Sequence, residues 1–358
     1  MPKSLLFIPD ISGYTSFVQS TEIEHSQHVI AELLEILIKA NTQHLELAEV
    51  EGDALFFYKT SGIPSQEKLL AQIETMHSAF YGHLKLLEKN RICPCNACAL
   101  APQLELKTIA HYGDIEFITV QGKKKPFGQS VIEIHRLLKN NIPSNNYTLI
   151  SKDLALELKM PLDYHSRLFK FNKHQENYDN QQLDFIYSEI DNDLLNILPF
   201  NSPKEVSFDY PPKLRKTISV HKSANAMLEL ITNYKYRHQW IKGVDSFEYD
   251  VNEVTRLGTE HVCVIDGKHF NFQTVTKRTD PGVLIYGELT EDIPTADAVY
   301  QFYLIKPASK VQCEITVEIY WVAKSIFKKL AMNLIAKRQF QNNLNYSLMK
   351  LKDLAEQA

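Results

Sequence analysis

The chain lacks both a long apolar run and a large net charge. None of its 358 residues falls in a stretch approaching the roughly 20 consecutive apolar residues that a membrane-spanning helix needs. With 39 Lys and Arg against 43 Asp and Glu, the formal net charge is −4, which argues against a general nucleic-acid binder. The first ten residues also lack the layout of a signal peptide. We therefore expect a cytoplasmic protein with no membrane span and no nucleic-acid partner.

Cysteine is scarce, and its distribution does not suit a disulfide framework. Of the five cysteines, Cys93, Cys95 and Cys98 lie within six residues and the other two stand alone. Three thiols at this spacing can hold Zn²⁺ when a fourth ligand is near, and His111 or a cysteine of a second copy is a candidate for it. A redox pair and buried small side chains are the alternative interpretations.

Length and composition predict two domains. With 358 residues, 44% of them hydrophobic, the chain is long for one domain and apolar enough for packed cores. Between residues 177 and 207 the sequence turns polar and rich in Asn, Asp and Pro, which is typical of a boundary. We place a first domain at 1–176, a linker at 177–205 and a second domain at 206–358.

The first part alternates strands and helices. In chain order, the pattern predicts a strand, a helix, a β-hairpin, a second helix and two strands. These elements cover residues 5–8, 22–43, 45–59, 66–89, 104–111 and 115–120. The order β-α-β-β-α-β predicts a ferredoxin-like sheet with helices on one face, and therefore an α+β fold.

The second part is dominated by strands. A strand at 214–220 and a helix at 224–240 come first. Six further strand candidates follow at 246–251, 261–265, 271–275, 283–289, 299–305 and 311–321. A long amphipathic helix runs from about 323 to 355. This order predicts a curved antiparallel sheet wrapped around one long C-terminal helix.

Two carboxylates are predicted to meet at neighbouring strand ends. Asp10 follows the first apolar run, and Asp53 lies at the tip of the hairpin. In a ferredoxin-like order the first strand and this hairpin share one sheet, so the two side chains can face each other. Adjacent carboxylates repel each other unless a divalent cation such as Mg²⁺ or Mn²⁺ joins them. The alternative for Asp10 is a cap of the following helix.

The segments around these carboxylates resemble the class III nucleotidyl cyclases. The run Asp10–Thr15 is similar to the opening Asp-Ile-x-Gly-Phe-Thr motif of that family, and Gly52-Asp53 is similar to its hairpin Gly-Asp. The resemblance implies a two-metal site in which Asp10, Asp53 and the carbonyl of Ile11 hold Mg²⁺ or Mn²⁺. Phosphates of a nucleoside triphosphate are expected at the backbone that follows, at Ser12, Gly13, Tyr14 and Thr15.

Glu49 and Lys125 stand where the cyclases select their base. Glu49 lies four residues before Asp53, and a carboxylate there accepts hydrogen bonds from guanine but offers no donor to adenine N1. Lys125 lies three residues before Gly128 and matches neither the adenylyl nor the guanylyl pattern. The alternative for Glu49 is a solvated strand residue in an acidic run. The resemblance implies a purine substrate, GTP or ATP.

Residues 127–136 resemble the Gly-x-x-Val-Asn-x-Ala-x-Arg helix of the same family. Arg136 occupies the motif position at which the family has an arginine that stabilises charge developing on the α-phosphate. Ile132 replaces the asparagine that orients the ribose, and an apolar side chain cannot hydrogen-bond a sugar. Because the family builds its sites from two subunits, the resemblance implies a homodimer. We expect a signalling enzyme that forms a 3′,5′-cyclic nucleotide; the alternative is an inactive dimer that senses or carries nucleotide or lipid.

The second part is similar to the START-related, polyketide-cyclase-like helix-grip domains (SRPBCC). The resemblance covers about 206–357 and rests on the order of elements, on Ser223–Met227 opening a helix and on the segment His238–Val244. It implies a cavity for a lipid or another apolar small molecule that regulates the first domain. Aromatic candidates for the cavity wall, which are alternatively plain core residues, are Trp240, Phe270, Phe272, Tyr286 and Phe302.

Overall fold

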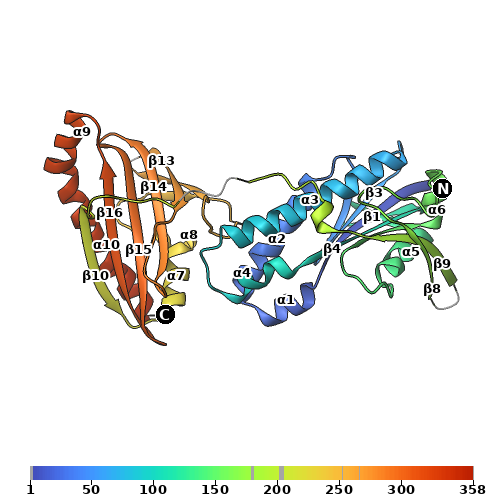
Figure 1. Cartoon of the computed structure of the whole chain (residues 1–358), viewed down its shortest axis with the longest axis horizontal. Coiled ribbons are helices and arrows are strands. Elements are labelled where there is room, and N and C mark those ends of the chain that lie inside the picture. The colour runs from blue at the N-terminus through green and yellow to red at the C-terminus, as the bar shows by residue number, and fades with distance from the viewer. Residues whose placement is uncertain (1–2, 179–180, 201–204, 252, 266, 358) are drawn as a thin grey trace. The chain divides into compact units, whose positions relative to one another are not determined.

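The computed structural model describes residues 3–178, 181–200, 205–251, 253–265 and 267–357 (Figure 1). Its contacts divide the chain into two compact units, Met1–Glu88 with Ala99–Phe200 and Lys89–Cys98 with Asn201–Ala358. Each unit contains a seven-stranded sheet with helices, so the predicted α+β fold is confirmed.

The domain boundaries at 176 and 206 stay a prediction. Within the expected linker, residues Gln181–Glu189 form a strand of the first sheet. Residues 201–204 of that linker lie outside the described residues.

The first unit is built on four strands in ferredoxin-like order. They are β1 (Lys3–Ser12), β2 (Glu46–Glu51), β3 (Ala54–Lys59) and β4 (Glu105–Asp114). Their spatial order is β2-β3-β1-β4, and β1 pairs antiparallel with both β3 and β4. All residues of β1 after Lys3 are buried, which explains the continuous apolar run at residues 5–8 within it.

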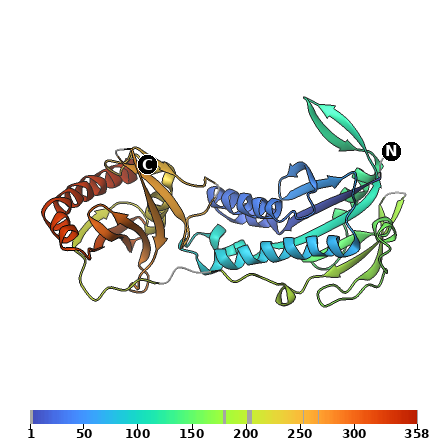
Figure 2. The same ribbon diagram turned by 90° about the horizontal axis from the view of Figure 1, so that it is seen from above.

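The longer helices of the first unit are α2 (Ile23–Lys39), α3 (Gln66–Lys89) and α5 (Gln129–Leu138). α2 and α3 run side by side in Figure 2. α5 packs on the face of β1 that carries Leu6, with which it shares one core cluster. Because side chains alternate along a strand, Asp10 points to the same face as Leu6.

The remaining elements before residue 200 extend this arrangement. β5 (Glu116–Val120) and β6 (Lys123–Phe127) form a separate hairpin that projects from the first unit in Figure 2. The main sheet continues beyond β4 with β7 (Tyr147–Ser151), β9 (Gln181–Glu189) and β8 (Asn172–Tyr178). Short helical segments are α1 (Tyr14–Ser20), α4 (Asn96–Leu100), α6 (Lys152–Glu157) and the 3₁₀ turns Ala101–Gln103 and Asn192–Leu194.

The second unit is the predicted curved antiparallel sheet with a long C-terminal helix. Its strands lie in the order β10-β16-β15-β14-β13-β12-β11. Their bounds are β10 (Leu214–Val220), β11 (Ser246–Glu248), β12 (Glu260–Ile265), β13 (Lys268–Val275), β14 (Leu284–Ile293), β15 (Ala296–Ser309) and β16 (Gln312–Val322).

Two helical regions complete the second unit. The predicted helix at 224–240 is split into α7 (Ala224–Thr232) and α8 (Tyr234–Arg237) at Asn233, whose side chain accepts a hydrogen bond from the Lys235 N–H. The terminal helix consists of α9 (Ile326–Ala331), a π-helical turn at Met332–Ala336 and α10 (Lys337–Gln357).

Candidate functional site

The structure brings Asp10 and Asp53 together. Asp10 pairs in register with Ala54, the first residue of β3, and the Ile11 N–H donates to the Asp53 carbonyl oxygen at 3.0 Å. Asp10 is only 8% exposed. Burial raises the pKa of the Asp10 carboxyl group and of the Asp53 carboxyl group, and the charge of Asp53 raises the pKa of Asp10 further. Two desolvated acids that repel each other form a site that favours a cation.

Lys107 is the cation that the structure itself supplies. Its Nζ lies 3.3 Å from Asp10 Oδ1, because Lys107 of β4 is the register partner of Asp10. The charge of Lys107 lowers the pKa of Asp10 against the larger effect of burial. Our sequence reasoning missed Lys107; the available signal was a lysine within an apolar strand predicted to neighbour the first one.

The chain turns at Gly13, shortly after Asp10. Gly13 has a φ of 88°, a left-handed conformation that favours glycine, and α1 begins at Tyr14. The Ser12 hydroxyl is buried and has no hydrogen-bond partner among the described residues. Tyr14 is half-buried and Thr15 is exposed. An unsatisfied hydroxyl two residues after Asp10 is a group that a bound ligand can satisfy.

The two residues expected to select the base contact each other. Lys125 Nζ of β6 donates to Glu49 Oε1 of β2 at 2.7 Å. The Lys125 and Glu49 side chains are 37% and 43% exposed, so the pair stabilises the chain by only about 0–1 kcal/mol. The Glu49 carboxylate can therefore exchange Lys125 for another donor at small cost.

Arg136 belongs to a polar network on α5. Its Nη1 donates to Gln181 Oε1 at 3.4 Å, and Gln181 Nε2 donates to Glu133 Oε1 at 2.6 Å. His111 Nε2 lies 3.1 Å from Glu133 Oε2. The hydrogen bond with His111 is the main cause that lowers the pKa of Glu133 to about 2. Ile132, on the same helix, is 50% exposed.

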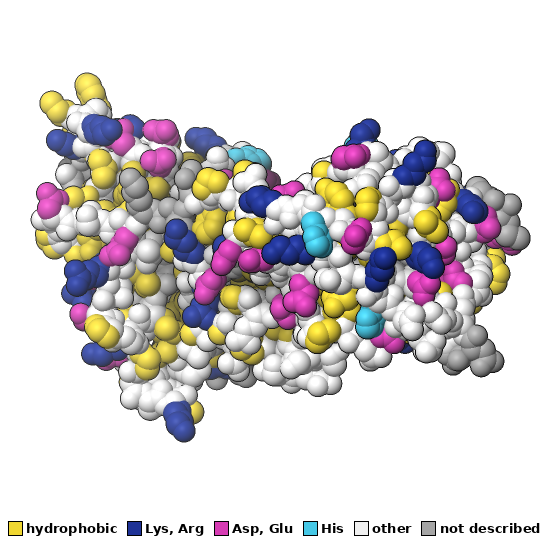
Figure 3. All heavy atoms as spheres, turned by 45° about the vertical axis from the view of Figure 1, so that its right-hand side comes forward, with side chains coloured by type: hydrophobic (Ala, Val, Ile, Leu, Met, Phe, Trp, Pro, Cys, Tyr) yellow, Lys and Arg dark blue, Asp and Glu magenta, His cyan; other side chains and the backbone are white. Residues whose placement is uncertain are grey.

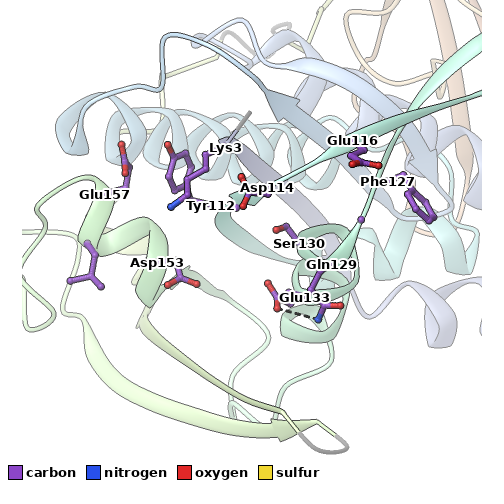
Figure 4. Close-up of a pocket in the computed structure, with 13 residues that line it drawn as sticks. Lys3, Tyr112, Asp114, Glu116, Phe127, Gln129, Ser130, Glu133, Asp153 and Glu157 are labelled. Atoms are coloured by element: carbon purple, nitrogen blue, oxygen red, sulfur yellow. Dashed lines mark hydrogen bonds between the residues drawn. The ribbon is translucent and has the colours of Figure 1, made fainter. Parts of the chain in front are cut away.

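Figure 4 shows a cavity of the first unit, whose volume is about 800 Å³ and whose lining includes neither Asp10 nor Asp53. It lies beside Lys3 at the start of β1, whereas Asp10 lies near the end of that strand. Its carboxylate side chains are Asp114, Glu116, Glu133, Asp153 and Glu157. Clustered carboxylates repel a triphosphate, so we do not assign the nucleotide to this cavity.

The three clustered cysteines lie close together. The Cys95 N–H donates to Cys93 Sγ at 3.5 Å, and the Cys98 N–H donates to Cys95 Sγ at 3.4 Å. The sulfur atoms of these three residues all lie within 4.8 Å of one another. His111, the fourth ligand considered from the sequence, contacts Glu133 instead. Three such sulfurs can supply three of the four ligands of a structural zinc site.

A cavity of about 340 Å³ lies within the second unit, lined by the sheet and by α10. Three of the aromatic residues expected at its wall do line it: Trp240, Phe270 and Phe272. Phe302 instead packs against Tyr320 on the other face, because neighbouring side chains of β15 alternate and Tyr303 takes the cavity side. Tyr286 does not border the cavity; its hydroxyl donates to Glu288 at 2.7 Å.

On the face shown in Figure 3, acidic and basic side chains of the described residues are interspersed. In the described part of the chain, every helix is too short or too polar to cross a bilayer.

Comparisons with known proteins match mainly the first unit. Residues 30–147 match the family described as "Protein of unknown function (DUF2652)". The uncharacterized protein Rv2561/Rv2562 of Mycobacterium tuberculosis is 31% identical over 126 residues, which are 35% of this chain and 58% of that protein. The matched region therefore spans less than two thirds of this relative.

Solved structures similar to the N-terminal half include adenylyl and guanylyl cyclase domains. The adenylyl cyclase CyaB from P. aeruginosa is 17% identical, with a TM-score of 0.40 over 53% of this chain and 94% of that chain. The guanylyl cyclase Cya2 is 15% identical, with a TM-score of 0.40 over 52% of this chain and 91% of that chain.

Proposed function

We propose that the first unit is a metal-dependent purine nucleotidyl cyclase of a signalling protein, acting on GTP or ATP. The observation that carries this proposal is the pair of carboxylates on adjacent strand ends, the buried Asp10 and the half-buried Asp53. The resemblance of the two surrounding motifs to class III cyclases supports it. Nucleoside triphosphates and reduced thiols are both found in the cytoplasm, where we place the protein.

The residues around the acid pair fit divalent cations. Asp10, Asp53 and the Ile11 carbonyl supply only oxygen ligands, which Mg²⁺ and Mn²⁺ prefer. The bound ions would supply charge neutralisation of the triphosphate and activation of the ribose 3′-hydroxyl. The unsatisfied Ser12 hydroxyl and the backbone of residues 13–15 would bind phosphate oxygens.

The other functional side chains are proposed to act across a homodimer. Arg136 would stabilise charge on the α-phosphate bound by a second copy, and Glu49 would accept hydrogen bonds from guanine. Exposed apolar side chains of β2, the β5–β6 hairpin and α5 support self-association. They are Leu47, Val50, Ile118, Val120, Phe127 and Ile132. Since β6 contacts both β2 and α5, these elements form one surface.

A cyclase assay with product identification tests the enzyme proposal. The full chain is incubated with Mn²⁺ and each of the four nucleoside triphosphates, and the products are identified by mass spectrometry. We expect a 3′,5′-cyclic purine nucleotide, and a loss on the order of 10²-fold or more in Asp53→Asn. Asp114→Asn, in the separate acidic cavity, is the matched control. Absence of any cyclic product, or equal rates for both variants, would overturn the proposal.

A second candidate is a dimer that binds nucleotide without turning it over. Ile132 favours it, because this half-exposed apolar side chain stands where the cyclases orient the ribose. Such a protein would be thermally stabilised by nucleotide with Mn²⁺ but form no product. In that case Ile132→Asn is expected to raise turnover, since it restores the missing hydrogen-bonding group.

We propose further that Cys93, Cys95 and Cys98 supply three ligands of a structural Zn²⁺, supported by the grouping of their sulfur atoms within 4.8 Å of one another. Metal analysis of the purified full chain should find about one zinc per chain. Cys95→Ser should lower this content, whereas Cys313→Ser, at a buried cysteine outside the group, should not. Zinc content no higher than in Cys95→Ser would refute the assignment.

The cavity of the second unit is proposed to bind an apolar small molecule that regulates the first unit. Its lining by Trp240, Phe270 and Phe272 supports this role.

A further inference from the structure

The cavity of the second unit contains a buried charge whose hydrogen bonding is incomplete. Arg237 is 1% exposed; its Nε donates to the Ile231 carbonyl at 3.0 Å, and its Nη1 donates to Glu288. Its Nη2 has no hydrogen-bond partner among the described residues. Guanidinium N–H groups that are buried without an acceptor are unfavourable, so this group indicates a missing acceptor.

Two more donors without a partner in the described part of the chain line the same cavity. They are Trp240 Nε1 and Thr290 Oγ1, on residues that are 1% and 6% exposed. An indole N–H and a guanidinium can only donate, and a threonine hydroxyl is able to donate. All three groups therefore suit an acceptor oxygen.

The nearby carboxylate of Glu288 accepts hydrogen bonds from other donors and, among the described residues, from none of these three atoms. Glu288 Oε1 accepts from Arg237 Nη1 and from the Tyr286 hydroxyl, and His261 Nε2 lies 3.4 Å from the same oxygen. Burial raises the pKa of Glu288, but the charge of Arg237 and the other donors keep that pKa below its ordinary value. Glu288 is therefore ionised and balances the charge of Arg237.

The rest of the cavity is largely apolar. Side chains that provide this surface include Phe270, Phe272, Val299, Ile319, Phe340 and Leu344. A volume of about 340 Å³ lies at the small end of the range for ligand pockets, about 300–1,000 Å³.

We propose that this cavity binds a small, largely apolar molecule through a carbonyl or carboxylate oxygen that accepts hydrogen bonds from Arg237, Trp240 and Thr290. This inference gives a chemical class to the ligand in the proposed function. The experiment below measures only ligand binding to the second unit, so absence of cyclase activity in the first unit would not change its result.

Calorimetric titration of the full chain with two pairs of probes tests the assignment. Laurate and 2-naphthoate carry acceptor oxygens, whereas laurylamine and 2-naphthylmethylamine carry donor-only cations on similar apolar bodies. We expect at least one oxygen-bearing probe to bind at least tenfold more tightly than its amine. Failure of both carboxylates to bind, or equal affinity within each pair, would overturn the proposal.

Conservative variants separate recognition from folding. Arg237→Met breaks a buried ion pair and is expected to unfold the unit, so Thr290→Val and Trp240→Phe are used instead. Each should weaken the bound carboxylate about 3- to 10-fold, the value of one hydrogen bond. Thr316→Val, at a position whose hydroxyl contacts Thr217 outside the cavity, should leave binding unchanged. Unchanged affinity in both test variants would count against the proposal.

Discussion

Replacing Lys107 with Met tests the charge balance at the acid pair. Lys107 Nζ lies 3.3 Å from Asp10 Oδ1, and the two side chains are 21% and 12% exposed. Coulomb's law with an effective dielectric constant of about 20 gives roughly 5 kcal/mol at this separation. Desolvation offsets part of this energy. We expect Lys107→Met to lower the free energy of unfolding by about 3 kcal/mol, the low end for a broken buried pair.

The same variant should respond more strongly to divalent cations than the wild type. Without Lys107, the carboxylates of Asp10 and Asp53 repel each other and lack the compensating charge that lies 3.3 Å from Asp10. Mn²⁺ at 100 times its dissociation constant adds about 2.7 kcal/mol of stability by linkage, which is nearly the whole expected loss. Urea denaturation with and without MnCl₂ measures both quantities.

The double variant Asp10→Asn with Lys107→Met is the matched control. It removes both members of the pair, so it should be more stable than Lys107→Met alone and should lose the additional Mn²⁺ response. If Lys107→Met gains no more stability from Mn²⁺ than the double variant does, Asp10 does not bind the cation and the reasoning is refuted.

A buried histidine, a crowded glycine and an exposed phenylalanine give three more tests. Burial lowers the pKa of His77 from 6.5 to about 3, so the free energy of unfolding should fall by about 1.4 kcal/mol per pH unit below pH 6.5. His77→Leu should flatten this slope, measured by urea denaturation at several pH values. An unchanged slope in the variant would contradict the prediction. Gly287→Ala places a Cβ 2.7 Å from the Val275 carbonyl oxygen and should lower the free energy of unfolding by about 1–3 kcal/mol. The loss is measured as a lower thermal midpoint. An unchanged midpoint would contradict the prediction and show that the strand can shift. Phe127→Asp, at a side chain 54% exposed, should shift the proposed dimer toward monomer in light scattering, whereas Leu198→Asp, 77% exposed outside that surface, should not.

Local pattern was sufficient for much of the fold. Apolar spacing predicted α3 at 66–89 and β10 at 214–220 with the bounds that the structure has, because each element buries one periodic face. The C-terminal helix was less predictable: amphipathic spacing runs through the π-helical turn at Met332–Ala336 without marking it. Strand β11 ends at Glu248, earlier than the predicted 251, because its pairing with β12 stops there.

Side-chain partners were mostly beyond the reach of the sequence. Lys107 faces Asp10 only through the antiparallel register of β1 and β4. Likewise, Arg237 and Glu288 meet across 51 residues of chain, and no local spacing relates them. A shift of one residue in the register of β1 and β4 would turn Asp10 and Lys107 to opposite faces.

By itself, the sequence determined the two-part α+β organisation and the placement of Asp10 and Asp53 at neighbouring strand ends, because hydrophobic periodicity and turn residues act over short distances. Only the tertiary structure decided which charges accompany those acids and where the second cavity has unsatisfied donors. These properties depend on strand register and on packing between residues far apart in the chain, which local patterns do not contain.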